Sequence, residues 1–388
     1  MEKKIQKERA VAVRRFIQGE SPEVISASMG KSRRWLYKWV ARHTPDDLSW
    51  CEDQSRRPHT SSHRTPAEIE EVVEMVRLSL YNKDLFCGNQ AIQWELEDME
   101  VQPIPSLRTI SRILCRRDLT HRRTGRYEPK GKAYPELPML LPNQTHQVDL
   151  VGPCYLSGPI RFYSLNSVDT AINRCGIEPM PSKAAQSVLD AVYAVWKRMG
   201  IPDNLQVDNE MAFFGSPIHP RGMGPLIRLC LLYGVNLWFI PPAEPWRNGV
   251  VEKFNDHYRQ KFLAKVTMTS MTRLRQASLA YEHKHNNAYR YSKLKGQTPL
   301  KALAGSGRKL VFPNRKAPQH PLEKPEEGCY HLVRFIRSNR QLNIFGEMFP
   351  APPETQYEYV VATIDVKEQK LKLFLDKFQI EQYKYRLR

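Results

Sequence analysis

Three acidic residues have the types and positions needed for metal-dependent chemistry on phosphodiesters. Asp149 and Asp208 each end a short predicted strand, over residues 146–148 and 205–207, and Glu252 lies near the start of a predicted helix. Two strand-end carboxylates and one helix carboxylate can meet at one edge of a sheet. Carboxylate oxygens suit Mg²⁺, or Mn²⁺ in its place. Two such ions, about 3.5–4 Å apart, can activate an attacking oxygen and stabilise a leaving one.

Each acid also has a purely structural interpretation. A single aspartate at a strand end is more often a turn residue or a helix cap. Asp169 also ends a predicted strand, and we expect only a supporting or capping role for it. Glu210, directly after the pair Asp208-Asn209, is expected to point to solvent rather than to join the metal site. What distinguishes the trio is its spacing and its flanking residues.

The positive charge of the chain is concentrated in two stretches. The net charge is +18; residues 101–142 contribute +6 and residues 248–316 contribute +12, so the rest of the chain balances to zero. Clustered charge of this kind favours a polyanionic partner. A basic protein with no such partner is the alternative.

The N-terminal residues predict a helix-turn-helix. Ser21-Pro22 is suited to begin a helix, Gly30 to end it and Ser32 to cap the next helix. The second helix is basic, as a recognition helix usually is. We expect three of its side chains to face DNA: Arg33, Arg34 and Lys38. An ordinary helical hairpin with a solvated basic face is the alternative.

A second helical unit has the same organisation. Thr65-Pro66-Ala67-Glu68 has the form of a capping box, and Ser106 is suited to cap a basic helix. Its apolar residues share one face, which leaves four arginines exposed: Arg108, Arg112, Arg116 and Arg117. A Pro-containing basic linker follows, and its Arg122 and Arg123 are expected to lie along phosphates.

From about residue 143 the pattern changes to strands followed by strand–helix alternation, which indicates an α/β or α+β domain. A long amphipathic helix is predicted over about residues 248–265. The last segment, from about residue 328, is rich in alternating strands with a polar turn at residues 367–369, which predicts a small β-barrel-like module.

These features resemble a DDE transposase of bacterial insertion sequences, with the catalytic core shared by retroviral integrases. The strings that carry the resemblance are HQVDLVG, LQVDNEMAF and PPAEPWRNGVVEKFNDHYRQKF. Glu252 matches the family's helical glutamate, Asn255 a frequent asparagine, and Arg259 a basic residue that helps to hold DNA. Lys253 is expected to bind phosphate as well. Two departures are the Glu210 in place of a glycine and a long interval between Asp208 and Glu252, which implies an insertion at about residues 215–225.

The resemblance implies a multidomain α+β protein with N-terminal helix-turn-helix units, a central RNase H-like α/β catalytic core and a C-terminal small β-barrel. The predicted parts are a helix-turn-helix domain over residues 1–50, a linker over 51–64, a second helix-turn-helix domain over 65–119, a basic linker over 120–142, an integrase-like catalytic core over 143–310 and a β-barrel-like domain over 328–388.

The implied function is that of a transposase, in which Asp149, Asp208 and Glu252 hold two Mg²⁺ or Mn²⁺ ions. The protein would bind the terminal inverted repeats of an element, free their 3′ ends and join them to target DNA. The implied partners are double-stranded DNA and further copies of this chain assembled on it. Two alternatives stay open: a catalytically inactive, transposase-derived DNA-binding regulator, and an RNase H-like nuclease with no joining step.

The location expected from the sequence is cytoplasmic, with nucleoid association when DNA is bound. The seven cysteines are an odd number, and no two lie within four residues of each other, which fits a reducing compartment and disfavours a zinc ribbon. The N-terminus lacks a signal-peptide pattern, and no membrane span is expected.

Overall fold

The computed structural model describes residues 2–45, 49–53, 65–120, 133–215, 219, 221–314, 316 and 318–388, with the side chains of residues 2–5 left out. The chain divides into two compact units, Met1–Arg64 and Thr65–Arg388. Each is described by itself.

The first unit is a bundle of three helices, α1 (Glu2–Ile17), α2 (Pro22–Met29) and α3 (Arg33–Val40), followed by the short helix η1 (Ser49–Cys51). The predicted caps form: the hydroxyl oxygens of Ser21 and Ser32 accept from the backbone N–H three residues on. Gly30 ends α2 in the left-handed region at φ 63°. The apolar core joins all three helices through Ala12, Ile25 and Leu36. The N-terminal region is therefore a helix-turn-helix, as predicted.

The second unit begins with three helices, α4 (Ala67–Asn82), α5 (Asn89–Asp98) and α6 (Leu107–Arg116). Ser106 caps α6 as expected. The predicted capping box at Thr65 does not form, because α4 begins at Ala67 with Pro66 at the cap position and no side-chain hydrogen bond there.

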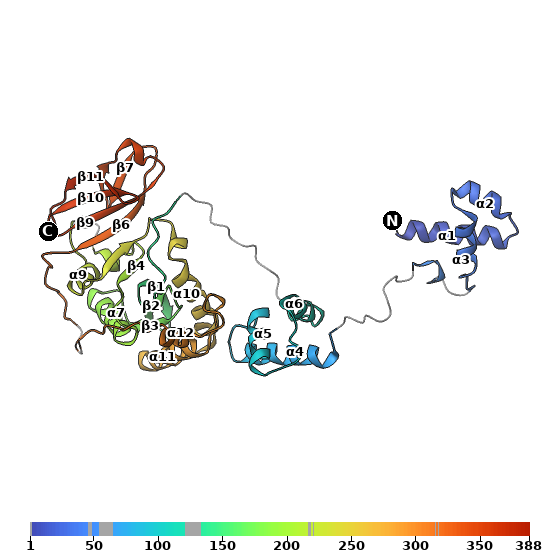
Figure 1. The fold of residues 1–388 in the computed structure, drawn as a ribbon, viewed down its shortest axis with the longest axis horizontal. Coiled ribbons are helices and arrows are strands. Elements are labelled where there is room, and N and C mark those ends of the chain that lie inside the picture. The colour runs from blue at the N-terminus through green and yellow to red at the C-terminus, as the bar shows by residue number, and fades with distance from the viewer. Residues whose placement is uncertain are drawn as a thin grey trace. The chain divides into compact units, whose positions relative to one another are not determined.

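A mixed sheet of nine strands is the centre of this unit (Figure 1), in the order β11-β10-β9-β6-β5-β4-β1-β2-β3. Four central strands are parallel: β1 (Thr145–Tyr155), β4 (Asn204–Val207), β5 (Asn236–Phe239) and β6 (Cys329–Phe335). The flanking strands are antiparallel: β2 (Arg161–Asp169), β3 (Cys175–Met180), β9 (Tyr359–Asp365), β10 (Lys370–Leu375) and β11 (Phe378–Lys384). A separate hairpin comprises β7 (Gln341–Ile344) and β8 (Glu347–Pro350), and the short helix η5 (Pro353–Thr355) follows it.

Helices pack on both faces of the sheet, which is why β2 and β3 are buried along almost their whole length. One face is covered by α7 (Ala185–Met199) and α9 (Pro225–Leu232), and the short α8 (Met211–Phe214) lies beside α9. The other face is covered by α10 (Gly249–Lys261) and α11 (Met271–Ala288). The remaining elements are η2 (Pro245–Asn248), η3 (Leu263–Lys265), η4 (Ser292–Leu294) and α12 (Pro299–Gly305). This is the predicted integrase-like α/β core.

The C-terminal strands do not form the predicted β-barrel. β6 pairs in parallel with β5, with Leu237 opposite Tyr330 and Phe239 opposite Leu332, and the sheet is not closed. The alternation in the sequence identifies the strands but not their neighbours, and the strands complete the sheet of the core instead of closing on themselves.

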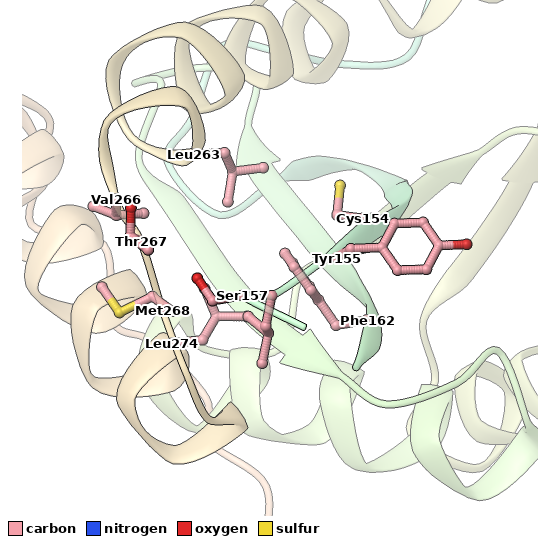
Figure 2. A pocket seen from close by; sticks show the side chains of 10 residues that line it. Cys154, Tyr155, Ser157, Phe162, Leu263, Val266, Thr267, Met268 and Leu274 are labelled. Atoms are coloured by element: carbon pink, nitrogen blue, oxygen red, sulfur yellow. The ribbon is translucent and has the colours of Figure 1, made fainter. Parts of the chain in front are cut away.

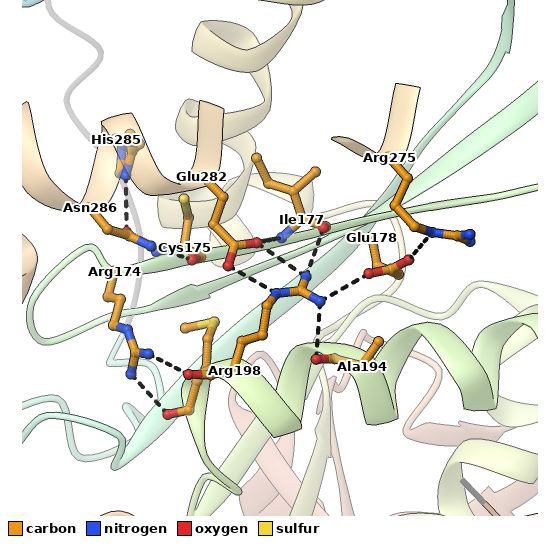
Figure 3. Close-up of polar contacts among 11 residues, drawn as sticks. Arg174, Cys175, Ile177, Glu178, Ala194, Arg198, Arg275, Glu282, His285 and Asn286 are labelled. Atoms are coloured by element: carbon orange, nitrogen blue, oxygen red, sulfur yellow. Dashed lines mark hydrogen bonds and ion pairs between the residues drawn. The ribbon is translucent and has the colours of Figure 1, made fainter. Parts of the chain in front are cut away.

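A network of charged side chains joins β3, α7 and α11 (Figure 3). Arg198 of α7 donates to Glu178 at 3.0 Å and to Glu282 at 3.0 and 3.1 Å, and Arg275 donates to Glu178 at 2.7 Å. Glu282 also accepts from the backbone N–H of Ile177 at 2.7 Å. The network fixes the two helix layers to β3, the edge strand of the sheet.

Basic side chains of α10, η3 and α11 contact the turn between α4 and α5. Lys261 donates to the carbonyl oxygens of Asp84 and Leu85 at 2.8 and 3.0 Å, and Lys265 and Lys284 lie beside the Asp84 carboxylate. Phe86 packs against the rings of His257, Tyr289 and Tyr291. We call this contact the Asp84 clasp.

No helix in the described part of the chain has the length and apolar character needed to cross a membrane.

Candidate active site

The register of the sheet brings Asp149 and Asp208 side by side. β1 and β4 are parallel neighbours in which Gln147 is paired with Gln206, and each aspartate lies two residues further along its strand. Adjacent strands are about 4.8 Å apart, and residues two apart project from the same face of a strand. The two carboxylates therefore start from equivalent positions on neighbouring strands. Asp208 directly follows β4, as the sequence predicts, whereas Asp149 lies inside β1, which continues to Tyr155 beyond the predicted strand end.

Glu252 is brought to the same edge because side-chain amides fix the start of α10 to these strands. The Gln147 Oε1 accepts from the backbone N–H groups of Val250 and Val251 at 2.9 and 3.2 Å. Gln206 donates to the Arg247 carbonyl oxygen at 2.7 Å, and Asn248 donates to the Val148 carbonyl oxygen at 3.0 Å. The helix N-terminus would otherwise leave unpaired N–H groups. Gln147 accepts hydrogen bonds from the first N–H groups of α10, and the same hydrogen bonds fix the position of Glu252 relative to the strands.

The three acids repel one another. Burial raises the pKa of Asp208 to about 6, and the charge of Asp149 contributes to the rise. The pKa of Asp149 is raised by burial and by the charge of Glu252. The pKa of Glu252 is raised by burial and by the charges of Asp256 and Asp208. Each member of the trio therefore feels the charge of another, which is the pattern of a site that binds a cation.

A buried amide relay orients Asp149. Asn255, on α10, donates to Asp149 Oδ2 at 2.7 Å and accepts from Asn166 at 2.7 Å. Ser164 donates to Asn166 at 2.8 Å. Asn255 was expected only as a family feature, and the structure gives it a contact with the acid. Asp169 has the expected capping role, since its carboxylate accepts from the backbone N–H groups of Asn143 and Ala171.

The donor chemistry of the trio fits a hard divalent cation, because three carboxylates that repel one another at one sheet edge offer oxygen ligands and an excess of negative charge. No group of three or more His, Cys, Asp or Glu residues in the described ranges is close enough to hold a metal ion as it lies. One oxygen of Asp208 accepts from the Glu210 N–H at 3.0 Å and one oxygen of Asp149 is taken by Asn255. Three-fold coordination therefore requires the side chains to turn towards each other.

Asp208→Asn should stabilise the cation-free protein at neutral pH. Because its pKa of about 6 in the folded state is above the ordinary value of about 4, the ionised carboxyl destabilises the fold at pH 7, and this cost is relieved as the pH falls through 6. We expect a gain of about 1–3 kcal/mol in the free energy of unfolding at pH 7, vanishing near pH 4. Urea unfolding in EDTA at both pH values measures it.

The control for this substitution is Asp190→Asn, on the exposed side of α7. This variant makes the same change from carboxyl to amide at a solvent-exposed position. A loss of stability in Asp208→Asn at pH 7, or an equal effect at both pH values, would contradict the mutual repulsion described above.

Two cations face the acidic trio. Arg259 lies on the exposed side of α10, and its charge lowers the pKa of Asp149. This agrees with the prediction that Arg259 and Glu252 share one face of the helix. Lys183, between β3 and α7, was not predicted; its charge lowers the pKa of Asp208. Lys183 pairs with Glu210 at 2.8 Å, so the extra glutamate holds a lysine beside the site and does not simply point to solvent. Nothing local in the sequence marks this pair.

The other predicted DNA-binding residues are dispersed over the helical units. Arg34 and Lys38 are exposed on α3, and Arg33 pairs with Glu23 at 3.0 Å. On α6, Arg108 and Arg112 are exposed, whereas Arg116 and Arg117 pair with Glu70 and Glu74 of α4. Lys253 is exposed on α10. Arg122 and Arg123 lie outside the described residues, as does part of the expected insertion at 215–225.

Two pockets differ in their relation to the acids. One, of about 420 Å³, is lined by Asp208, Asn209, Glu210, Met211 and the segment 240–245. Asp208 is the member of the trio that lines it, and its walls combine polar side chains with prolines. The pocket in Figure 2, of about 340 Å³, lies between the end of β1 and the segment 263–274. None of the three acids lines this second pocket, so only the first is part of the candidate site.

Comparisons with known proteins agree with the architecture. The family model described as an integrase core domain matches residues 233–299, which include Glu252, and the model described as a homeodomain-like domain matches residues 6–49. The magnesium complex of the HTLV-2 integrase catalytic core domain, in its trimeric form, is 17% identical with a TM-score of 0.34, covering 42% of this chain and 99% of that one.

Two further solved structures are similar to a comparable degree. The simian T-cell lymphotropic virus intasome, in complex with the PP2A regulatory subunit B56 gamma, is 16% identical with a TM-score of 0.38, covering 74% of this chain and 88% of that one. The catalytic core domain of BIV integrase is 16% identical with a TM-score of 0.31, covering 42% and 95%. The chain thus matches an integrase core domain over residues 233–299 and a homeodomain-like domain over residues 6–49.

Proposed function

We propose that the protein is a DDE-type DNA transposase, a metal-dependent polynucleotidyl transferase in which Asp149, Asp208 and Glu252 are the catalytic acids. The observation that carries the proposal is the placement of two aspartates at equivalent positions on neighbouring parallel strands, with the glutamate helix fixed to the same strands by Gln147 and Gln206.

The trio would hold Mg²⁺ or Mn²⁺, with two ions expected. When bound, such a pair supplies charge neutralisation for the attacking and leaving oxygens of an in-line displacement. Asn255 keeps Asp149 oriented through its 2.7 Å hydrogen bond. The charge of Arg259 lowers the pKa of Asp149 and that of Lys183 lowers the pKa of Asp208, so both cations are suited to contact the phosphates that flank the reacting one. Positioning and electrostatics then account for most of the catalysis.

The reaction has two steps that need no enzyme-linked intermediate. Water first attacks the phosphodiester at an element end, the bond from phosphorus to the 3′ oxygen breaks, and a 3′ hydroxyl is released. That hydroxyl then attacks a phosphodiester of the target, a new bond from phosphorus to oxygen forms, and a target 3′ oxygen leaves. The first step is a hydrolysis. The second step exchanges one phosphodiester bond for another at almost no cost in free energy, so the chemistry requires no external energy source.

The helical regions would select the DNA. The exposed basic side chains of α3 and α6 are suited to bind the terminal inverted repeats, and residues Lys253, Arg122 and Arg123 to bind phosphates. Because two ends must be joined to one target, we expect a homo-oligomer of this chain on double-stranded DNA. We place the activity in the cytoplasm, at the nucleoid when DNA is bound.

Product analysis tests the proposal against its two alternatives. The purified protein is incubated with Mn²⁺, a labelled DNA fragment that carries an element end, and a supercoiled plasmid. A transposase gives labelled DNA covalently joined to plasmid. Free nicks without joined product would identify a nuclease, and end binding without any strand breakage would identify a DNA-binding regulator; either result would replace the proposal.

A further inference from the structure

Two side chains of the C-terminal strands, Arg334 and Tyr359, make hydrogen bonds with the segments that carry the acids. These strands were expected to form a separate module, yet β6 lies directly beside β5 in the same sheet. Its Arg334 and the Tyr359 of β9 extend to residues next to Asp208 and next to the start of α10. The contacts therefore connect the end of the chain to the candidate active site.

Arg334 is the first of these connections. It is 5% exposed and donates to four acceptors: the carbonyl oxygens of Ile240, Val333 and Asn343, at 3.3, 2.9 and 3.0 Å, and Asn209 Oδ1 at 2.9 Å. Asn209 in turn donates to the Ile240 carbonyl oxygen at 2.6 Å. The residue after Asp208 is thus held to the end of β5 through one guanidinium group.

Tyr359 is the second connection. Its hydroxyl group donates to the Glu244 carboxylate at 2.8 Å and accepts from Arg247 Nη2 at 3.1 Å. Arg247 also donates to Glu244 at 3.1 Å, and its carbonyl oxygen is the acceptor for Gln206 at 2.7 Å. The hydrogen bonds therefore continue from β9 through η2 to β4, which Asp208 directly follows.

The choice of residue at position 334 points to positioning rather than to stability alone. A buried guanidinium is costly even when it is fully hydrogen-bonded, and an apolar side chain of similar length often stabilises such a place better. The guanidinium has five donors in a fixed plane, so it can bind Asn209 and Ile240 at once in a defined geometry. The cost in free energy of burying Arg334 is consistent with a need to fix the position of Asp208.

We propose that Arg334 and Tyr359 are positioning residues for the catalytic acids: Arg334 fixes Asp208 through Asn209, and Tyr359 fixes the start of the Glu252 helix through Glu244 and Arg247. The C-terminal strands are then part of the catalytic unit. The expected effect of these residues on the rate rests on the proposed function. Their expected effect on the order of residues 208–211 and 240–248 rests on the contacts alone.

The test compares Arg334→Lys, Asn209→Ala and their double variant with the parent, using the exposed Arg337→Gln, in the turn after β6, as the control. We expect cooperative unfolding and unchanged binding to element ends. The rate of strand transfer should fall about 10- to 100-fold, because a small displacement of catalytic groups has effects of this size. The Mn²⁺ concentration for half-maximal rate should rise about 10-fold, and raised Mn²⁺ should partly restore the rate. The double variant should lose little more than either single variant, because both single variants remove the hydrogen bond between Arg334 and Asn209.

Hydrogen–deuterium exchange gives a readout that does not need activity. Amides in residues 208–211 and 240–248 should exchange faster in Arg334→Lys, while those of β9 to β11 keep the parent's protection. If the parent itself neither cuts nor joins DNA, the proposed function fails and the exchange measurement alone decides the positioning role. Parental rates, Mn²⁺ dependence and exchange in folded Asn209→Ala and Arg334→Lys would overturn the inference. If Arg334→Lys does not fold, Asn209→Ala decides it.

Discussion

Asp149→Asn, Asp208→Asn and Glu252→Gln should each abolish strand transfer, with rates lower by about 1,000-fold or more, while binding to element ends is retained. Each substitution removes one negative charge and one cation ligand but keeps the volume of the side chain. The remaining carboxylates then neither attract nor orient the cation. Joined product measured at saturating DNA and Mn²⁺ gives the rate, and a gel-shift with competitor DNA gives the binding.

Asp256→Asn is the matched control for these three variants. Asp256 lies one turn after Glu252 on α10 and is exposed. Its charge acts on Glu252, but Asp256 is not one of the three proposed catalytic acids, so we expect a change in rate of less than about 10-fold. Full joining activity in any variant of the trio, or an equal loss in Asp256→Asn, would refute the assignment of the three acids.

Deletion of residues 328–388 should prevent the core from folding, although a separate module could be removed without this effect. The deletion exposes the edge of β5 and removes fully buried aliphatic side chains, among them Leu332, Val360, Ile364, Leu371 and Leu373. At about 1.5–3 kcal/mol for each, the loss is about as large as the whole stability of an ordinary domain, about 5–15 kcal/mol. We expect an aggregating product without a cooperative unfolding transition by circular dichroism and calorimetry.

Two controls make this deletion decisive. Removal of residues 1–64, which form a compact unit of their own, should leave a folded remainder. The isolated fragment 320–388 should be unfolded, because the parallel partner of β6 is absent from it. A folded fragment 320–388 together with a folded, soluble 1–327 would contradict the continuous sheet.

The features that the sequence predicted correctly are local ones. The Ser21, Ser32 and Ser106 caps form because a cap needs only a hydroxyl group and an N–H group a few residues on. Strands β9 and β10 were predicted from alternation and the intervening turn. The capping box at Thr65 was wrong, since Pro66 occupies the cap position.

What the sequence could not give is the pairing of distant segments. The closure of the C-terminal strands into a barrel was wrong because alternation is the same whether a strand pairs with its own hairpin or with β5, about ninety residues earlier. The trio stays a prediction from its flanking residues, and the register of β1 and β4 agrees with it by placing Asp149 and Asp208 at equivalent positions. The positioning groups were missed: Gln147, Gln206 and Arg334 gain their roles only from partners on other strands.

The Asp84 clasp changes what the basic stretch 248–316 can contribute to DNA binding. Several of its cations already face carboxylates that are far away in the sequence: Lys265 and Lys284 at Asp84, Arg275 at Glu178, Arg290 at Asp98 and Arg308 at Asp203. A cation that stays with its own protein's carboxylate displaces no counterion from the duplex. The decrease of affinity with the logarithm of salt concentration should therefore be shallower than the count of Lys and Arg in this stretch suggests.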